Sequence, residues 1–118
     1  MIRNKTGIWG EIFAVRYLRD RKYKILTVNY RSRFGEIDII AEKKNTVCFV
    51  EVKTRSEDPM FRPSDAVDES KQSRIRTTAE HFISVFGISR EARFDVCEVW
   101  LDDNYHLSEI NYIKDAFQ

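Results

Sequence analysis

The chain has 118 residues, of which 42% are hydrophobic and 33% are charged. This length and composition predict one compact core, so residues 1–118 are expected to form a single domain, and a disordered chain is excluded. Twenty Lys and Arg residues balance 19 Asp and Glu residues, which excludes a protein that binds nucleic acid through its net charge alone. The sequence has no leader-like N-terminus and no long apolar stretch, so we expect a cytoplasmic protein without membrane contact.

The N-terminal half predicts one helix followed by three strands. Residues 6–20 carry apolar side chains at helical spacing and predict an amphipathic helix. Residues 29–35 predict a polar loop, and the second and third strands are expected to form a hairpin that turns near Lys44 and Asn45. The three strands are predicted over residues 23–28, 36–41 and 46–53.

The C-terminal half predicts a long helix and two more strands. Pro59 and Pro63 frame a loop, after which Ser64 is expected to cap a helix that ends at Gly87. The two strands are predicted over residues 93–101 and 106–113. This order predicts an α/β fold with an αβββαβ core, in which helices flank a central mixed sheet.

Three charged residues lie on strand positions that the pattern predicts to be buried. Asp38 is the one carboxylate of the otherwise apolar segment 37–40, and Glu51 and Lys53 share the apolar face of the next strand. With the hairpin turn where it is predicted, Asp38 lies opposite Glu51, where paired Cβ atoms are about 5 Å apart. Glu11 points toward the core side of the first helix. Two carboxylates and one lysine are therefore expected to converge, with Glu11 in reach.

Such a cluster is either a structural ion-pair network or a metal site. Two adjacent carboxylates raise each other's pKa unless a cation neutralises them, and one lysine does so only in part. Oxygen ligands without His or Cys favour Mg²⁺ or Mn²⁺ over zinc. We favour a magnesium or manganese site over the structural network. Asp95, which alternates with apolar neighbours, is instead expected to form a structural salt bridge.

The same residues carry a family resemblance. Asp38, followed after twelve residues by Glu51-Val52-Lys53, resembles the PD-(D/E)xK pattern of the restriction-endonuclease-like nucleases. A wider set resembles the YraN family of uncharacterised bacterial proteins, which is similar to archaeal Holliday-junction resolvases. The chain departs from the expected family pattern at residues 61–63 (FRP). The matching set covers nearly the full length and consists of Gly10-Glu11, residues 35–41 (GEIDIIA), residues 49–55 (FVEVKTR), Lys71 and residues 93–96 (RFDV).

The resemblance implies a restriction-endonuclease-like fold and a role for each matching residue. It implies that Asp38 and Glu51 are metal ligands, with the Val52 carbonyl as a third. It also implies that Lys53 positions or activates water. Glu11 resembles the helix glutamate of the resolvases and is implied as a further ligand; the alternative is a structural ion pair with Lys53 or Arg33. Phosphodiester hydrolysis needs charge stabilisation at phosphorus and an activated water, and a metal ion supplies both.

Basic residues near this cluster are candidate nucleic-acid contacts. In the loop before the Asp38 strand, two guanidinium groups flank a hydroxyl donor, which suits a phosphate, although a solvated turn explains this loop equally well. Lys71 and Arg74 share one face of the long helix at i,i+3 spacing. The predicted contacts are Arg31, Ser32, Arg33, Arg55, Lys71 and Arg74.

Together these observations predict a Mg²⁺- or Mn²⁺-dependent nuclease that hydrolyses phosphodiester bonds of nucleic acid, with structure-specific DNA as the first candidate partner. A homodimer is left open. The alternative is a non-catalytic nucleic-acid-binding module on a nuclease fold. A chain that had lost catalysis would be expected to lose Asp38, Glu51 or Lys53 first, and all three are present. A purely protein-binding scaffold is disfavoured, because it gives no reason for charges on an apolar strand face.

Overall fold

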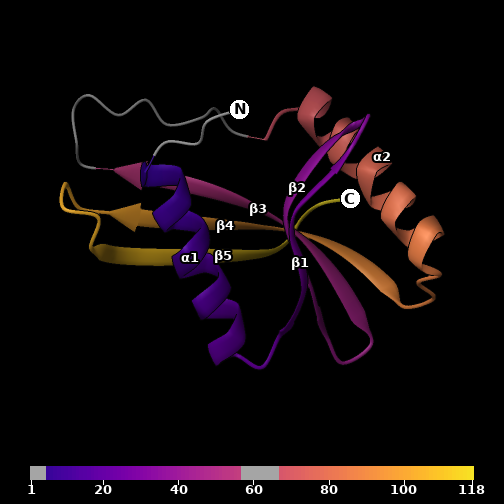
Figure 1. Ribbon diagram of the computed structural model, residues 1–118, viewed down its shortest axis with the longest axis horizontal. Coiled ribbons are helices and arrows are strands. Elements are labelled where there is room, and N and C mark those ends of the chain that lie inside the picture. The colour runs from indigo at the N-terminus through magenta and orange to yellow at the C-terminus, as the bar shows by residue number, and fades with distance from the viewer. Residues whose placement is uncertain (1–4, 57–66) are drawn as a thin grey trace.

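Helices and strands follow one another in the predicted order. The computed structural model of the chain describes residues 5–56 and 67–118. Neither helix of these residues is long and apolar enough to cross a membrane. The departure at residues 61–63 lies outside the described residues. The elements are α1 (Lys5–Asp20), β1 (Lys24–Ser32), β2 (Gly35–Lys43), β3 (Thr46–Ser56), α2 (Glu69–Phe86), β4 (Glu91–Leu101) and β5 (Leu107–Phe117) (Figure 1).

The five strands form one mixed sheet in the order β1-β2-β3-β4-β5. β3 and β4 are parallel, and every other neighbouring pair is antiparallel. α2 lies in the connection between the two parallel strands, which cannot be joined by a tight turn. The predicted α/β class with a central mixed sheet is therefore confirmed.

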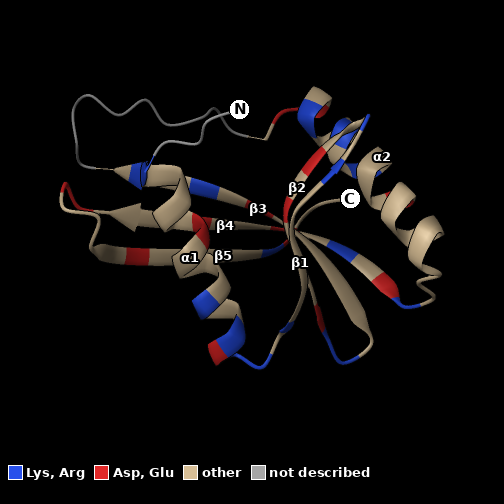
Figure 2. Ribbon diagram, in the orientation of Figure 1, with Lys and Arg blue, Asp and Glu red and all other residues tan. Residues whose placement is uncertain are grey.

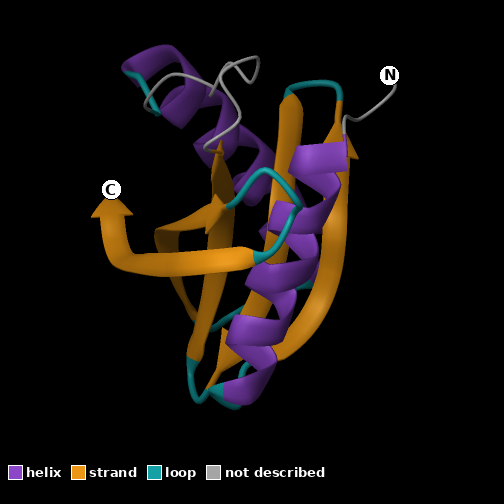
Figure 3. Cartoon of the chain, turned by 90° about the vertical axis from the view of Figure 1, so that its left-hand side faces the viewer, coloured by secondary structure: helices purple, strands orange, loops and turns teal. Residues whose placement is uncertain are grey.

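The two helices cover opposite faces of this sheet. Along β3, Cys48 and Val50 pack in a cluster with α1, whereas Val47 and Phe49 pack in a cluster with α2. Because successive side chains of a strand point to opposite faces, this alternation places one helix on each face. α1 runs lengthwise along the strands (Figure 3). The alternation continues to Glu51 and Lys53. Both therefore share the face of Val47 and Phe49, as predicted, and this is the face that α2 covers.

β2 breaks its alternation at Asp38. Ile37 packs with α2, but Ile39 packs with α1, although residues two apart on a regular strand share a face. On the neighbouring β1, Asn29 has a positive φ of 53°. The irregularity therefore affects both strands and places Asp38 at the point where β2 turns from one face to the other.

The predicted polar loop over residues 29–35 is wrong. β1 continues to Ser32 and β2 already begins at Gly35, so only a two-residue turn separates the strands. Within this extension Arg31 pairs with Glu36 in the strand register and in an ion pair of 3.4 Å. Cross-strand backbone pairing and this ion pair stabilise the extension of the two strands.

The long helix begins later than predicted. Asp68 caps α2, and its carboxylate accepts a 2.8 Å hydrogen bond from the backbone N–H of Lys71. A carboxylate at this position satisfies an orphan N–H and opposes the helix dipole, so the predicted cap by Ser64, which lies outside the described residues, is wrong. The predicted end at Gly87 is confirmed: its φ is 62° and its N–H donates to the carbonyl of Ile83.

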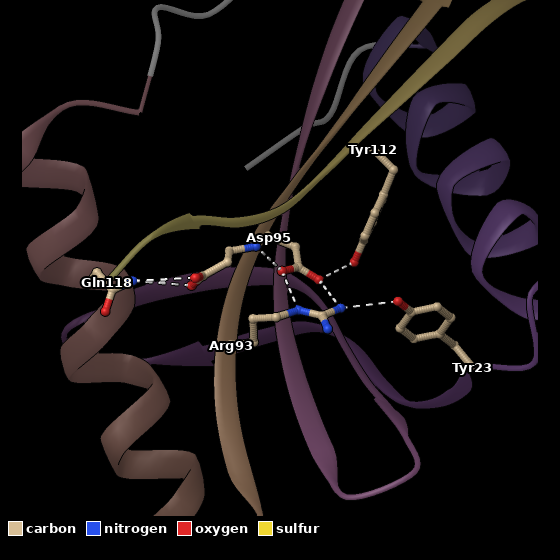
Figure 4. A network of polar contacts seen from close by, with 6 residues as sticks. Tyr23, Arg93, Asp95, Tyr112 and Gln118 are labelled. Carbon is tan, nitrogen blue, oxygen red and sulfur yellow. Dashed lines mark hydrogen bonds and ion pairs between the residues drawn. The ribbon is translucent and has the colours of Figure 1, made fainter.

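A buried polar network ties β4 to β5 and to the connection between α1 and β1 (Figure 4). Asp95 is fully buried and accepts two 2.9 Å hydrogen bonds from the guanidinium of Arg93. It also accepts hydrogen bonds from the Tyr112 hydroxyl at 2.5 Å and the Asp115 backbone N–H at 2.9 Å. Arg93 donates further to the Tyr23 hydroxyl at 3.1 Å. The structural salt bridge predicted for Asp95 is confirmed, with an arginine as its partner.

Candidate functional site

A pocket of about 460 Å³ lies where β2 and β3 meet the first turns of α2. Its wall combines three carboxylates with two basic side chains. The structure thus brings together four of the predicted site residues, from the second and third strands and the long helix. The lining residues are Gly35, Glu36, Asp38, Glu51, Lys71, Arg74 and Ile75.

Asp38 is held in this pocket by the neighbouring strand. Its Oδ2 accepts a 2.8 Å hydrogen bond from the backbone N–H of Val52. Burial and, next, the negative charge of Glu51 raise the pKa of Asp38 from its ordinary value of 3.8 to about 7, against the stabilising effects of the Val52 N–H and of Lys71. A cation bound nearby would stabilise the ionised form of this carboxylate.

Glu51 forms an ion pair with a lysine of α2. Its Oε1 lies 2.7 Å from Nζ of Lys71, with the Glu51 side chain 7% exposed and that of Lys71 37% exposed. Burial alone would lower the pKa of Lys71, but the hydrogen bond and charge of Glu51 outweigh this and raise it. The sequence marked Lys71 as a phosphate contact only, because the strand pattern carries no information on where the helix crosses the sheet.

Lys53 lies beside the pocket, deeper in the protein. It is only 2% exposed and lines a neighbouring pocket of about 190 Å³, together with Arg55 and Glu98. Burial and, next, the positive charge of Lys71 lower the pKa of Lys53 below its ordinary value. Its ammonium therefore gives up a proton more readily than that of an exposed lysine. Arg55 pairs with Glu98 at 3.4 Å, so it accompanies Lys53 rather than lining the Asp38 pocket.

Glu11 lines a different pocket from that of Asp38 and Glu51. It lines a pocket of about 380 Å³ between α1 and β1, together with Arg16 and Arg19. Within residues 5–56 and 67–118, no three His, Cys, Asp or Glu side chains form a group able to hold a metal ion. The role of Glu11 as a further ligand stays a prediction.

The tip of the β1–β2 hairpin adds basic residues next to the start of α2 (Figure 2). Arg31 is held by its ion pair with Glu36, and the guanidinium of Arg33 lies 5.0 Å from the ring centre of Phe34. Ser32 accepts a 3.0 Å hydrogen bond from the Phe34 backbone N–H, so its hydroxyl helps to hold the turn. A phosphate contact by these residues stays a prediction.

Glu36 is a pocket residue that the sequence reasoning missed. It lies two residues before Asp38 on the same strand and its charge helps to raise the pKa of Asp38. The i,i+2 spacing of the two acids was the available signal. Glu36 is the first residue of the predicted second strand, where a charged side chain is usually solvent-exposed.

The fold and the pocket define an α/β protein with paired carboxylates and flanking lysines at the meeting of a sheet and a helix. The chain belongs to a family described as "Uncharacterised protein family UPF0102", which matches residues 10–99. It is 44% identical over 116 residues to a UPF0102 protein of Caldicellulosiruptor bescii, covering 96% of the chain and 97% of that protein. It is 43% identical over 119 residues to one of Alkaliphilus oremlandii, covering 98% and 100%. A third relative, from Moorella thermoacetica, is 40% identical over 118 residues, covering 99% and 98%.

Proposed function

We propose that the chain is a divalent-metal-dependent nuclease of the PD-(D/E)xK type, which hydrolyses phosphodiester bonds of nucleic acid. One observation carries this proposal. Asp38 and Glu51, from adjacent strands, line one pocket, and the buried Lys53 lies two residues beyond Glu51 on the same strand face. The αβββαβ order of the elements supports it, because it is the core order of the nuclease fold that the motif resembles.

The chemistry of the donor set fits a hard divalent cation. Asp38 and Glu51 offer carboxylate oxygens to one pocket, and Mg²⁺ and Mn²⁺ prefer oxygen ligands. Burial and, next, repulsion by Glu51 raise the pKa of Asp38, and a bound cation would relieve that repulsion. Asp38 and Glu51 would hold the ion, with the Val52 carbonyl as the predicted third ligand. A bound ion would supply Lewis acidity and a water of lowered pKa.

The remaining charged residues suit the handling of a phosphate. A water oxygen forms a new bond to phosphorus, one ester P–O bond breaks, and a proton passes from the water to the leaving oxygen. Lys53, with its lowered pKa, can accept or supply that proton at Nζ or stabilise the negative charge at phosphorus. Lys71 and Arg74, on the rim of the pocket, can bind the phosphate oxygens.

A cleavage panel tests the proposal. Branched, duplex and single-stranded DNA, with matched RNA strands, are incubated with the protein and Mn²⁺ or Mg²⁺. We expect cleavage of at least one DNA substrate that is lost on addition of a chelator and in the Lys53→Met variant. Cleavage that survives in Asp38→Ala or Lys53→Met would contradict the assigned site.

A second candidate function is a nucleic-acid-binding module without catalysis. It is favoured by the ion pair of Lys71 with Glu51, which already neutralises one of the two proposed ligands. The same panel separates the two functions. Salt-sensitive binding without cleavage of any substrate by the wild type would favour the module.

A further inference from the structure

Lys71 holds the carboxylate that a metal ion would need. Its Nζ lies 2.7 Å from Oε1 of Glu51, whose side chain is 7% exposed. The backbone of Lys71 is fixed in the first turn of α2 by the cap from Asp68. The ion pair is therefore made from an anchored helix onto a buried strand residue, and only the side chain of Lys71 needs to move to break it.

An ammonium group and a divalent cation compete for such a carboxylate. Both neutralise the same charge and both use the same oxygen lone pairs, and together with the nearby Lys53 they would leave the pocket with an excess of positive charge. Occupation of Glu51 by one cation therefore disfavours the other. The 37% exposure of the Lys71 side chain gives its ammonium a path toward solvent.

A displaced ammonium would lie on the rim of the pocket beside Arg74, which lines the same wall one turn further along α2. A phosphate group of nucleic acid would replace Glu51 as its anionic partner.

We propose that Lys71 is an exchangeable internal counterion: a divalent cation displaces its ammonium from Glu51, and the freed ammonium binds a phosphate of the nucleic acid. Metal binding and nucleic-acid binding are then positively coupled through this one side chain. By linkage, each ligand strengthens the other by the same factor. The inference rests on the proposed function, because it assumes that a cation binds Asp38 and Glu51.

The competition is tested first, without any substrate. Mn²⁺ affinity is measured by isothermal titration calorimetry for the wild type, Lys71→Met and Arg74→Met. Lys71→Met keeps the aliphatic stem and removes the competing charge, while Arg74→Met removes a charge from the same wall and serves as the matched control. We expect Lys71→Met to bind Mn²⁺ about fivefold or more tightly than the wild type, with a clearly smaller gain in Arg74→Met.

Equal gains in the two variants, or weaker binding by Lys71→Met, would overturn the exchange while leaving the metal site in place. Absence of Mn²⁺ binding in the wild type and in both variants would instead overturn the metal site and the exchange together. If Lys71→Met does not fold, as judged by circular dichroism, Lys71→Gln takes its place, because it keeps a hydrogen-bond donor for Glu51 and still removes the charge.

The coupling is tested with a fluorescently labelled DNA oligonucleotide at constant ionic strength, with and without Ca²⁺. In the wild type and in Arg74→Met we expect Ca²⁺ to tighten DNA binding by about fivefold or more. In Lys71→Met the Ca²⁺ effect should be markedly smaller, because no ammonium is released. An equal Ca²⁺ effect in all three proteins would show general charge neutralisation and would overturn the exchange. A wild type that does not bind DNA at all would overturn the phosphate step.

Discussion

The backbone N–H of Val52 donates a 2.8 Å hydrogen bond to Oδ2 of Asp38, and so links the break in β2 to the strand that carries Glu51 and Lys53. This bond holds a carboxylate in surroundings that disfavour its charge, since burial and Glu51 raise the pKa of Asp38 to about 7. The stability of the metal-free protein should therefore depend on pH through this residue.

The first prediction concerns Asp38→Asn. Because the pKa of Asp38 is about 7 in the folded protein and 3.8 ordinarily, the folded state binds more protons between these values, and the wild type loses stability as the pH rises through that window. The amide of Asn carries no charge, and its oxygen can still accept the Val52 N–H. We expect the variant to be more stable by at least about 1 kcal/mol at pH 7.5, and to match the wild type near pH 4.

Thermal melts between pH 4 and pH 8 in the presence of a chelator measure this effect. A gain of this size corresponds to a shift of roughly 3–6 °C for a domain of this length. A difference that does not vary with pH would show that the charge of Asp38 is not the cause.

The second prediction concerns metal binding and stability. A cation that binds only the folded state stabilises it by mass action, by about 2.7 kcal/mol at a free concentration a hundred times Kd. Saturating Mn²⁺ should therefore raise the melting temperature of the wild type, but not that of the Asp38→Asn, Glu51→Gln double variant. Equal shifts in both proteins would place the bound ion elsewhere.

The third prediction is that cleavage and binding depend on different residues. Lys53→Ala and Asp38→Ala should abolish cleavage. In metal-free buffer both should leave nucleic-acid affinity similar, or tighter for Asp38→Ala, because a negative charge near phosphate is removed. Neutralising Arg31, Arg33 or Lys71 should weaken binding to all sequences and flatten the salt dependence by about one unit of slope for each phosphate that is no longer neutralised. Salt-titrated binding and cleavage on one substrate measure both quantities, and unchanged cleavage by Asp38→Ala would argue against the enzyme.

The fourth prediction concerns the buried Asp95 network. Arg93→Met leaves the fully buried Asp95 without its cation and should cost about 3–5 kcal/mol of stability. Tyr112→Phe removes one hydrogen bond to a charged group and should cost about 1.5–3 kcal/mol. Urea denaturation measures both, and Asp95→Asn combined with Arg93→Met should recover part of the loss. An additive result for that pair would show that the two residues do not interact.

The fifth prediction concerns the close packing of α1 against β3 at Gly10. A Cβ built on Gly10 of α1 would collide with the side chain of Thr54 of β3, so Gly10→Ala should cost about 1–3 kcal/mol. Adding Thr54→Ala removes the colliding hydroxyl and methyl groups and should recover most of this cost. The double-mutant cycle needs Thr54→Ala alone as its control. Equal effects of Gly10→Ala with and without Thr54 would attribute the cost to the helix backbone instead.

Much of the architecture could be predicted from local sequence patterns. The alternation of Val47, Phe49 and Glu51 correctly placed the charged end of β3 on one face, because a strand repeats every two residues. The turn at Lys44 and the helix end at Gly87 were correct because both depend on the conformations that short segments allow. Family membership could also be predicted, since the motifs extend over most of the chain.

The sequence by itself thus determined the order of the elements and the shared face of the β3 residues. Only the tertiary structure decided that Lys71 pairs with Glu51, and that β2 changes face at Asp38. Local patterns indicate periodicity along a single element, whereas the distance between two charged groups depends on how a helix crosses a sheet. That crossing is set by the packing of Ile75, Ala79 and Phe82 against the strands, and it brings Lys71 to Glu51, which lies on a different element.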